Sequence, residues 1–176
     1  MKYDYLAIEK KWQEKWEAAG VFRALDEKEA GGKPKFYALV EFPYPSGAGM
    51  HVGHIKAYSG LEVVSRMRRM QGYNVLFPMG FDAFGLPTEN YAIKTGMHPR
   101  AVTDKNIAKF TQQLKRVGYG FDWGRVIDTT DEDYYRWTQW IFLKMFEAGL
   151  AFRDTALVNY CPTCKVVLSN EDSQGG

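Results

Sequence analysis

A strand followed by a loop and a helix start constrains this chain more than any other part of it. Residues 36–42 form an almost continuous apolar and aromatic run, which is typical of a strand buried on both faces of a parallel sheet. A loop rich in proline and glycine follows at 43–50, and a helical pattern begins at His51 and His54. Because the first amides and the dipole of a helix attract negative charge, this arrangement predicts an anion site at the end of the strand.

Composition sets the broad class of protein. A chain of 176 residues holds one substantial domain, or one with a small appendage, and its 45% apolar residues exclude a disordered chain. The net charge of +2 neither requires nor excludes nucleic acid. We expect a cytoplasmic protein, because the start lacks a targeting pattern, no apolar run reaches the length of a membrane span, and the only cysteines, Cys161 and Cys164, are too close to staple a secreted fold.

Periodicity predicts the other elements. We expect helices near residues 5–20, 53–71, 88–96, 104–117 and 131–148, and further strands at 74–77, 156–160 and 165–168. The positions expected to be buried are Ala57, Leu61, Val64 and Met67 on the second helix, Ile107, Phe110, Leu114 and Val117 on the fourth, and residues 140–146, which are apolar almost all round, on the fifth.

The order strand, helix, strand over residues 36–77 predicts a right-handed parallel crossover in an α/β sheet. Ligands of such sheets bind beyond the carboxyl ends of the strands, so the loop at 78–87 should lie beside the first loop. Three arginines, Arg66, Arg68 and Arg69, close the crossover helix. They suit the negative pole of a helix, and phosphate contact is the alternative.

The two histidines point to phosphate chemistry. Donors placed where charge develops on a phosphoryl group lower the barrier to nucleotidyl transfer, and Gly53 leaves room for a base or ribose near the backbone. Metal binding fits less well, because no third ligand accompanies His51 and His54 at suitable spacing. Asp82, in the second loop, is either an acid for a substrate ammonium or an aspartate that stabilises its own turn.

The sequence resembles the class I aminoacyl-tRNA synthetases, in the form of the signature that leucyl-tRNA synthetases carry. The first block combines residues 42–47 with His51-Val52-Gly53-His54, and the second is Gly80 to Asn90. Further similarity lies at residues 70–75 and 134–144. Synthetases for isoleucine and valine differ in both blocks, so the resemblance favours leucine.

The resemblance implies a fold, a reaction and roles for particular residues. The fold is the first half of a Rossmann-like parallel-sheet catalytic domain at residues 1–149, and the start of a small zinc-knuckle insertion at 150–176. The reaction joins leucine to ATP as leucyl-adenylate, with Mg²⁺, and then transfers leucine to tRNA(Leu). The implied ATP site contains Pro43, His51, Gly53 and His54, with both histidines catalytic, and the implied leucine site contains Phe42, Tyr44 and Asp82.

Other implications concern the end of the sequence. Cys161 and Cys164 match the first half of the zinc knuckle of the family, although two inert thiols would look the same. No second cysteine pair and no lysine-rich signature is present, so we expect an N-terminal piece of a longer enzyme that does not charge tRNA alone. The alternatives are a small nucleotidyltransferase with the same histidine signature, and a non-catalytic zinc-knuckle binding module derived from half a synthetase.

Overall fold

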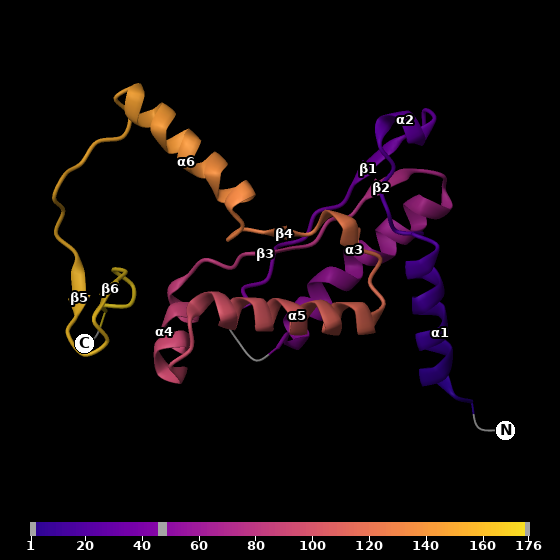
Figure 1. Cartoon of the computed structure of the whole chain (residues 1–176), viewed down its shortest axis with the longest axis horizontal. Helices are drawn as coiled ribbons and strands as arrows, with labels where there is room; N and C mark the ends of the chain where they lie inside the picture. The colour runs from indigo at the N-terminus through magenta and orange to yellow at the C-terminus, as the bar shows by residue number, and fades with distance from the viewer. Residues whose placement is uncertain (1–2, 46–48, 175–176) are drawn as a thin grey trace. The chain divides into compact units, whose positions relative to one another are not determined.

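The computed structural model describes residues 3–45 and 49–174 (Figure 1). The chain divides into two compact units, one up to Tyr135 and the other from Arg136 onward, and each is described by itself. The functional boundary expected after residue 149 stays a prediction.

The first unit contains most of the secondary structure. Its elements are α1 (Tyr5–Ala18), α2 (Glu27–Ala30), β1 (Lys35–Tyr37), α3 (Val52–Met70), β2 (Asn74–Leu76), β3 (Gly80–Phe81), α4 (Leu86–Thr95), α5 (Pro99–Val117), the 3-10 turn η1 (Trp123–Arg125) and β4 (Ile127–Asp128). Helix α6 (Glu132–Glu147) runs from the first unit into the second, which also holds β5 (Asn159–Cys161) and β6 (Val166–Leu168).

Parallel pairing confirms the predicted crossover. β1 pairs with β2 in the register Phe36↔Val75, and β3 pairs with β4 in the register Phe81↔Asp128. The amide of Ala38 also donates to the carbonyl of Leu76 (2.9 Å), and that of Asp122 donates to the carbonyl of Phe77 (2.8 Å). Residues 74–82 therefore run between two parallel neighbours, residues 35–43 and residues 121–129.

Strand β1 is shorter than the predicted 36–42. Its ladder with β2 ends at the bond from Ala38, and the chain meets its neighbour again at Pro43, whose carbonyl accepts the amide of Asp82 (3.1 Å). The side chain of Leu39 is 58% exposed. The apolar run correctly placed an extended segment. Burial on both faces requires a packed layer on each side of the strand, and the described residues do not supply both.

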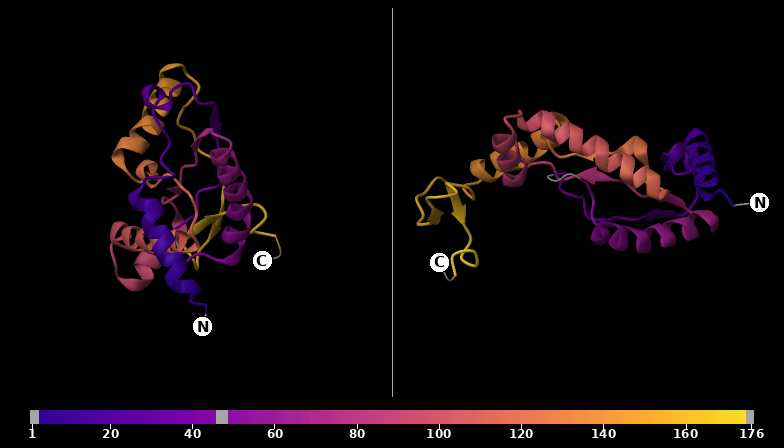
Figure 2. Two further views of the ribbon diagram at one scale, coloured as in Figure 1. Left: turned by 90° about the vertical axis from the view of Figure 1, so that its right-hand side faces the viewer. Right: turned by 90° about the horizontal axis from the view of Figure 1, so that it is seen from below.

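The hydrophobic core lies between these strands and the helices α3 and α5. It combines Tyr58 from α3 and Phe110 and Leu114 from α5 with Phe77 and Phe121 beside the central chain. Helix α1 flanks the C-terminal end of α5 in Figures 1 and 2, where the amide group of Gln13 donates to the carbonyl of Arg116 (3.0 Å).

The predicted buried face of helix α3 is only partly correct, because Leu61 packs against the core and Val64 is partly buried, but the most buried residues are different ones. Tyr58, Glu62 and Ser65 are buried, whereas Ala57 and Met67 are exposed. Glu62 is tolerated inside because its carboxylate accepts the amide of Gly120 (2.8 Å) and pairs with Arg66. The spacing of apolar residues along a helix does not reveal this buried face, because one of its members is an acid whose carboxylate accepts a buried backbone N–H.

The arginines of α3 hold the fold together. Arg66 donates to the carbonyl of Gly118 (2.7 Å) and stacks on Trp16, while Arg69 donates to the carbonyl of Gly120 (2.9 Å). Arg68 lies over the rings of Phe36 and Tyr73. These contacts support a structural role for the cluster.

Replacing Glu62 with glutamine should lower the free energy of unfolding by about 1–3 kcal/mol, because the buried group loses its charge-assisted bonds to Gly120 and Arg66. Urea denaturation measures the change. Glu14→Gln is the matched control, since its exposed pair with Lys10 contributes little. Equal midpoints for Glu62→Gln and the parent chain would contradict the assignment.

Two helix starts differ from the predictions. Helix α4 begins at Leu86, with Pro87 in its first turn, and Thr88, where the helix was expected to begin, is buried inside it. Helix α5 begins at Pro99 rather than Asp104, because proline suits the first helical turn and the Nδ1 atom of His98 accepts the amide of Arg100 (3.2 Å).

The predicted burial of residues 140–146 is wrong for the described part of the chain. Helix α6 forms almost as expected, but Trp140, Phe142 and Phe146 are each more than half exposed. Apolar residues on every side of a helix need covering layers on every side, and residues 136–174, the described part of the second unit, provide none for α6. The hairpin of β5 and β6, with Cys161 and Cys164 at its turn, matches the two predicted strands.

Candidate active site at the strand ends

The two predicted loops lie side by side. The backbone bond from Asp82 to Pro43 joins them, and a Cβ atom at Gly80 would overlap the ring of Phe42. The second loop therefore needs glycine at position 80 so that Phe42 can pack against its backbone. Phe42, Pro43, Tyr44 and Asp82 come together as the sequence suggested, while Ser46, Gly47 and Ala48 fall outside the described residues.

Tyr44 and Asp82 form the polar contact between the loops. The Tyr44 hydroxyl faces the Asp82 carboxylate, and hydrogen bonding to this carboxylate, together with its charge, raises the pKa of Tyr44. Asp82 is half-buried, and the Tyr44 side chain is exposed. A carboxylate has about four acceptor positions, so Asp82 can accept the Tyr44 hydroxyl and still pair with a cation.

His51 and His54 cap the same helix reciprocally. The Nδ1 atom of His51, the residue before α3, accepts the amide of Gly53 (3.1 Å), and the Nδ1 atom of His54 accepts the amide of His51 (3.3 Å). Their ring centroids are 3.9 Å apart. An Nδ1 atom that accepts a hydrogen bond carries no proton, so the neutral rings hold theirs on Nε2 and can donate it outward.

The surroundings of His54 favour its neutral form. Burial lowers its pKa below the ordinary value of 6.5, and the nearby His51 lowers it further. The rings of Tyr58 and Phe110 lie 6.0 and 6.4 Å from that of His54. The helix start thus presents the neutral N–H donor of His54 to an anion.

The lowered pKa of His54 predicts a pH dependence of stability. The unfolded chain binds the proton more readily, so the contribution of His54 is complete above pH 6.5 and is lost as the pH falls through the lowered folded-state pKa. Urea denaturation above and below pH 6.5 should show this decrease in the parent chain and a smaller one in His54→Gln. Identical pH profiles would contradict the prediction.

Gly53 has a structural reason as well as the predicted functional one. A Cβ atom at this position would lie 2.9 Å from the His51 ring, so a side chain would displace the capping histidine. The sequence reading attributed the glycine to ligand approach and had no means of detecting this internal contact.

Two residues of α5 that sequence reasoning missed anchor the first loop. The buried Asn106 donates to the carbonyl of Pro45 (2.7 Å), and Gln113 accepts the amide of Met50 (3.0 Å). Asn106 lies four residues before Phe110 on the buried face of α5. A polar residue within an apolar stripe was the available signal.

Comparison with known proteins identifies the family. The family model described as "tRNA synthetases class I (M)" matches residues 37–175. This chain belongs to the class I tRNA synthetases. It is similar to the Leucine--tRNA ligase of Alkaliphilus oremlandii, at 58% identity over 99% of this chain and 21% of the relative, and to that of Chlorobaculum tepidum, at 54% identity over 98% and 21%.

A solved structure gives the same result for this synthetase chain. The crystal structure of the ternary complex of Agrobacterium radiobacter K84 agnB2 LeuRS-tRNA-LeuAMS matches with a TM-score of 0.86 and 36% identity, over 97% of this chain and 22% of that one. The leucyl-type resemblance and the α/β class I fold are confirmed. The chain spans about a fifth of the length of these relatives, which favour the synthetase over the two alternative functions.

The two cysteines of this synthetase chain, Cys161 and Cys164, lie close together. The amide of Cys164 donates to the Sγ atom of Cys161 (3.3 Å), and hydrogen bonds from Cys164 lower the pKa of the Cys161 thiol. Among residues 3–45 and 49–174, no group of three or more metal-binding side chains occurs. Structural zinc takes four ligands, so the described residues do not by themselves fit the metal.

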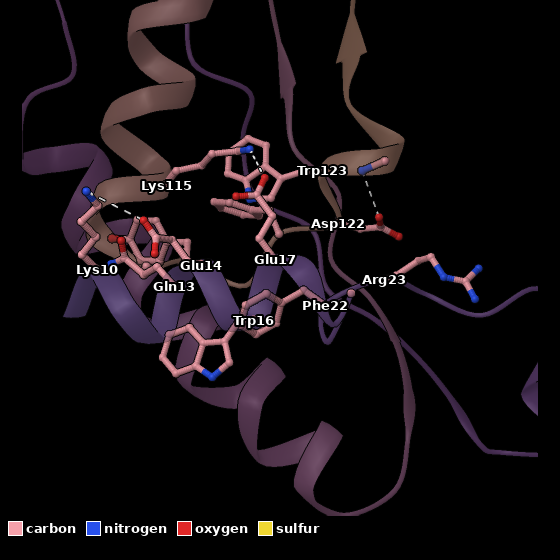
Figure 3. Close-up of a pocket in the computed structure, with 15 residues that line it drawn as sticks. Lys10, Gln13, Glu14, Trp16, Glu17, Phe22, Arg23, Lys115, Asp122 and Trp123 are labelled. Carbon is pink, nitrogen blue, oxygen red and sulfur yellow. Dashed lines mark hydrogen bonds and ion pairs between the residues drawn. The ribbon is translucent and has the colours of Figure 1, made fainter. Parts of the chain in front are cut away.

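Figure 3 shows a cavity of about 390 Å³ that is separate from the candidate site. It lies between α1 and the end of α5, with Trp16 and Phe22 in its wall. The Lys115 and Glu17 charges at this cavity are paired (2.5 Å), and none of the predicted site residues lines it.

In the described ranges, no helix has both the length and the hydropathy to cross a membrane.

Proposed function

We propose that this chain is the N-terminal part of a leucyl-tRNA synthetase and carries half of its adenylate-forming site. The observation that carries the proposal is the joining of the two loops, where the amide of Asp82 donates to the carbonyl of Pro43 (3.1 Å) and its carboxylate faces Tyr44. One loop leads to the paired histidines and the other presents the acid. Leucine and ATP are the substrates, and tRNA(Leu) is the acceptor.

The histidines are assigned to ATP. Their Nε2–H groups donate to phosphate oxygens, and this interaction strengthens as charge develops during transfer. Pro43 and Gly53 line the path of the adenosine. Bound Mg²⁺ neutralises phosphate charge. The half-buried His54 and the exposed His51 lie at the helix end where the dipole also favours an anion.

Asp82 is assigned to the leucine ammonium, with Phe42 and Tyr44 as walls of the pocket. Once the ammonium is held, the leucine carboxylate attacks the α-phosphorus of ATP and the bond to pyrophosphate breaks. No protein nucleophile takes part. The contribution of the chain is to orient both substrates and to stabilise charge.

Two proposals concern what the part of the relatives outside this chain, about four-fifths of their length, would supply. Zinc ligation by Cys161 and Cys164, in a knuckle that starts near residue 150, requires two further ligands from outside this sequence. This chain alone is expected to bind ATP and leucine weakly and to leave tRNA uncharged, because it lacks the lysine signature that would hold the leaving pyrophosphate.

A chimera tests the proposed function. This chain replaces the matching fifth of the Alkaliphilus oremlandii Leucine--tRNA ligase, with which it shares 58% identity. The chimera should catalyse ATP–pyrophosphate exchange that depends on leucine and not on isoleucine or valine, while the 176-residue chain alone should not charge tRNA. A folded chimera without leucine-dependent exchange would overturn the assignment.

A further inference from the structure

Asp82 is held through the backbone on both sides. Its own amide donates to the Pro43 carbonyl (3.1 Å), and the amide of the next residue, Ala83, donates to the hydroxyl of Thr129 (2.9 Å). Ala83 is buried and Thr129 is half-buried. The backbone around Asp82 is therefore fixed by two hydrogen bonds, one to the first loop and one to the residue that follows β4.

The hydrogen bond that the Thr129 hydroxyl accepts from the Ala83 amide takes the place of a backbone hydrogen bond of the parallel ladder. In the ladder of β3 and β4, the amides of Ile127 and Thr129 donate to the carbonyls of Met79 and Phe81 (3.1 and 3.2 Å). Continued parallel pairing would direct the amide of Ala83 to the backbone carbonyl of Thr129. The side-chain hydroxyl accepts that amide instead, so the two chains can diverge after Thr129 while the loop with Asp82 stays attached.

A polar network fixes the turn that contains Thr129. Asp128 accepts both the amide (2.8 Å) and the hydroxyl (2.6 Å) of Thr130, and Arg100 donates to the Thr130 hydroxyl (3.2 Å). Arg100 also pairs with Asp104 (2.9 Å) on its own helix. The hydroxyl of Thr129 thus projects from a turn tied to the first part of α5.

We propose that Thr129 is a positioning residue for the amino-acid-binding acid Asp82. By holding the amide that follows Asp82, it aims the carboxylate toward the Tyr44 hydroxyl and the substrate ammonium. The proposal rests on the proposed function, in which Asp82 binds leucine. Thr129 itself touches neither leucine nor ATP and acts only through the backbone of the second loop.

Three variants of this chain separate positioning from general stability. Thr129→Val keeps the shape and removes the acceptor, and Thr129→Ser restores the acceptor. Thr95→Val makes the same chemical change at a hydroxyl whose bond to the carbonyl of Tyr91 (2.8 Å) stays within α4. NMR titrations with leucine and with Mg-ATP give the two affinities. Thr129→Val should weaken leucine binding roughly tenfold, as the loss of one hydrogen bond implies, with ATP binding unchanged. Thr129→Ser and Thr95→Val should retain the leucine affinity of the parent.

A second measurement does not depend on leucine. The ¹³Cζ resonance of Tyr44 reports the interaction of its hydroxyl with Asp82, and it should shift in Thr129→Val but not in Thr129→Ser or Thr95→Val. An unchanged resonance in a folded Thr129→Val chain would overturn the positioning role, as would equal losses of leucine and ATP affinity. If the parent chain binds no leucine, the expected weak leucine binding by this chain alone is wrong and the affinities are measured in the chimera, where absence of leucine binding would overturn the proposed function. The Tyr44 resonance decides separately whether Thr129 positions Asp82.

Discussion

Replacing Asp82 with asparagine in the chimera is expected to lower kcat/KM for leucine in pyrophosphate exchange roughly 100- to 1,000-fold. The variant keeps the volume of the side chain but removes the charge opposite the ammonium, and losing one member of a desolvated charge pair costs about 2–5 kcal/mol. The affinity for ATP should change little, because phosphate contacts are assigned to the other loop.

Two control substitutions are compared with Asp82→Asn. Tyr44→Phe removes the hydroxyl bond to Asp82 but keeps the acid, so its effect should be smaller. Asp26→Asn makes the same chemical change at an exposed residue that pairs with Arg125 (2.6 Å), and exchange should be unaffected. Full leucine activity in Asp82→Asn would remove the acid from the proposed pocket.

Replacing His54 with alanine should lower kcat for exchange at saturating substrates about 100- to 1,000-fold, which is the typical cost of removing one donor that stabilises transition-state charge. The substitution also removes the acceptor for the His51 amide (3.3 Å), so part of the loss passes through the orientation of His51. Pyrophosphate exchange across a range of ATP and leucine concentrations separates kcat from KM.

His98 provides the matched control for His54. It caps α5 through the same kind of bond, from the amide of Arg100 to Nδ1 (3.2 Å), but lies outside the two signature loops. His98→Ala should lose stability without losing exchange. If both alanine variants lose exchange equally, capping rather than phosphate contact explains the effect of His54.

Local chemistry made the frame of the site predictable. The apolar runs before residues 43 and 78 placed two extended segments in parallel, and the loops that follow such segments meet at one edge of the sheet. The proximity of Pro43 and Asp82 follows from that rule. The capping bonds of His51 and His54 do not, because a pair of histidines reveals nothing about which ring nitrogen accepts a backbone amide.

Contacts between residues far apart in the chain could not be predicted from the sequence. Glu62 is buried because Gly120, distant along the chain, supplies an amide, and no helical period encodes that partner. Trp140 and its neighbours were expected to be buried because their composition suits a covered helix, yet burial depends on what packs against them. Thr129 directly follows β4, and only the contact of its hydroxyl with the Ala83 amide (2.9 Å) reveals its role.

A ligand cycle tests the central claim, that one crevice holds an ammonium at Asp82 and a phosphate at the histidines. An uncleavable leucyl-adenylate analogue and its deaminated counterpart are titrated calorimetrically into the chimera and its Asp82→Asn variant. Loss of the ligand ammonium should cost the parent chimera roughly 100-fold in affinity and cost the variant almost nothing, because the interaction is already absent. An equal penalty in both proteins would show that the ammonium binds elsewhere and would contradict the account.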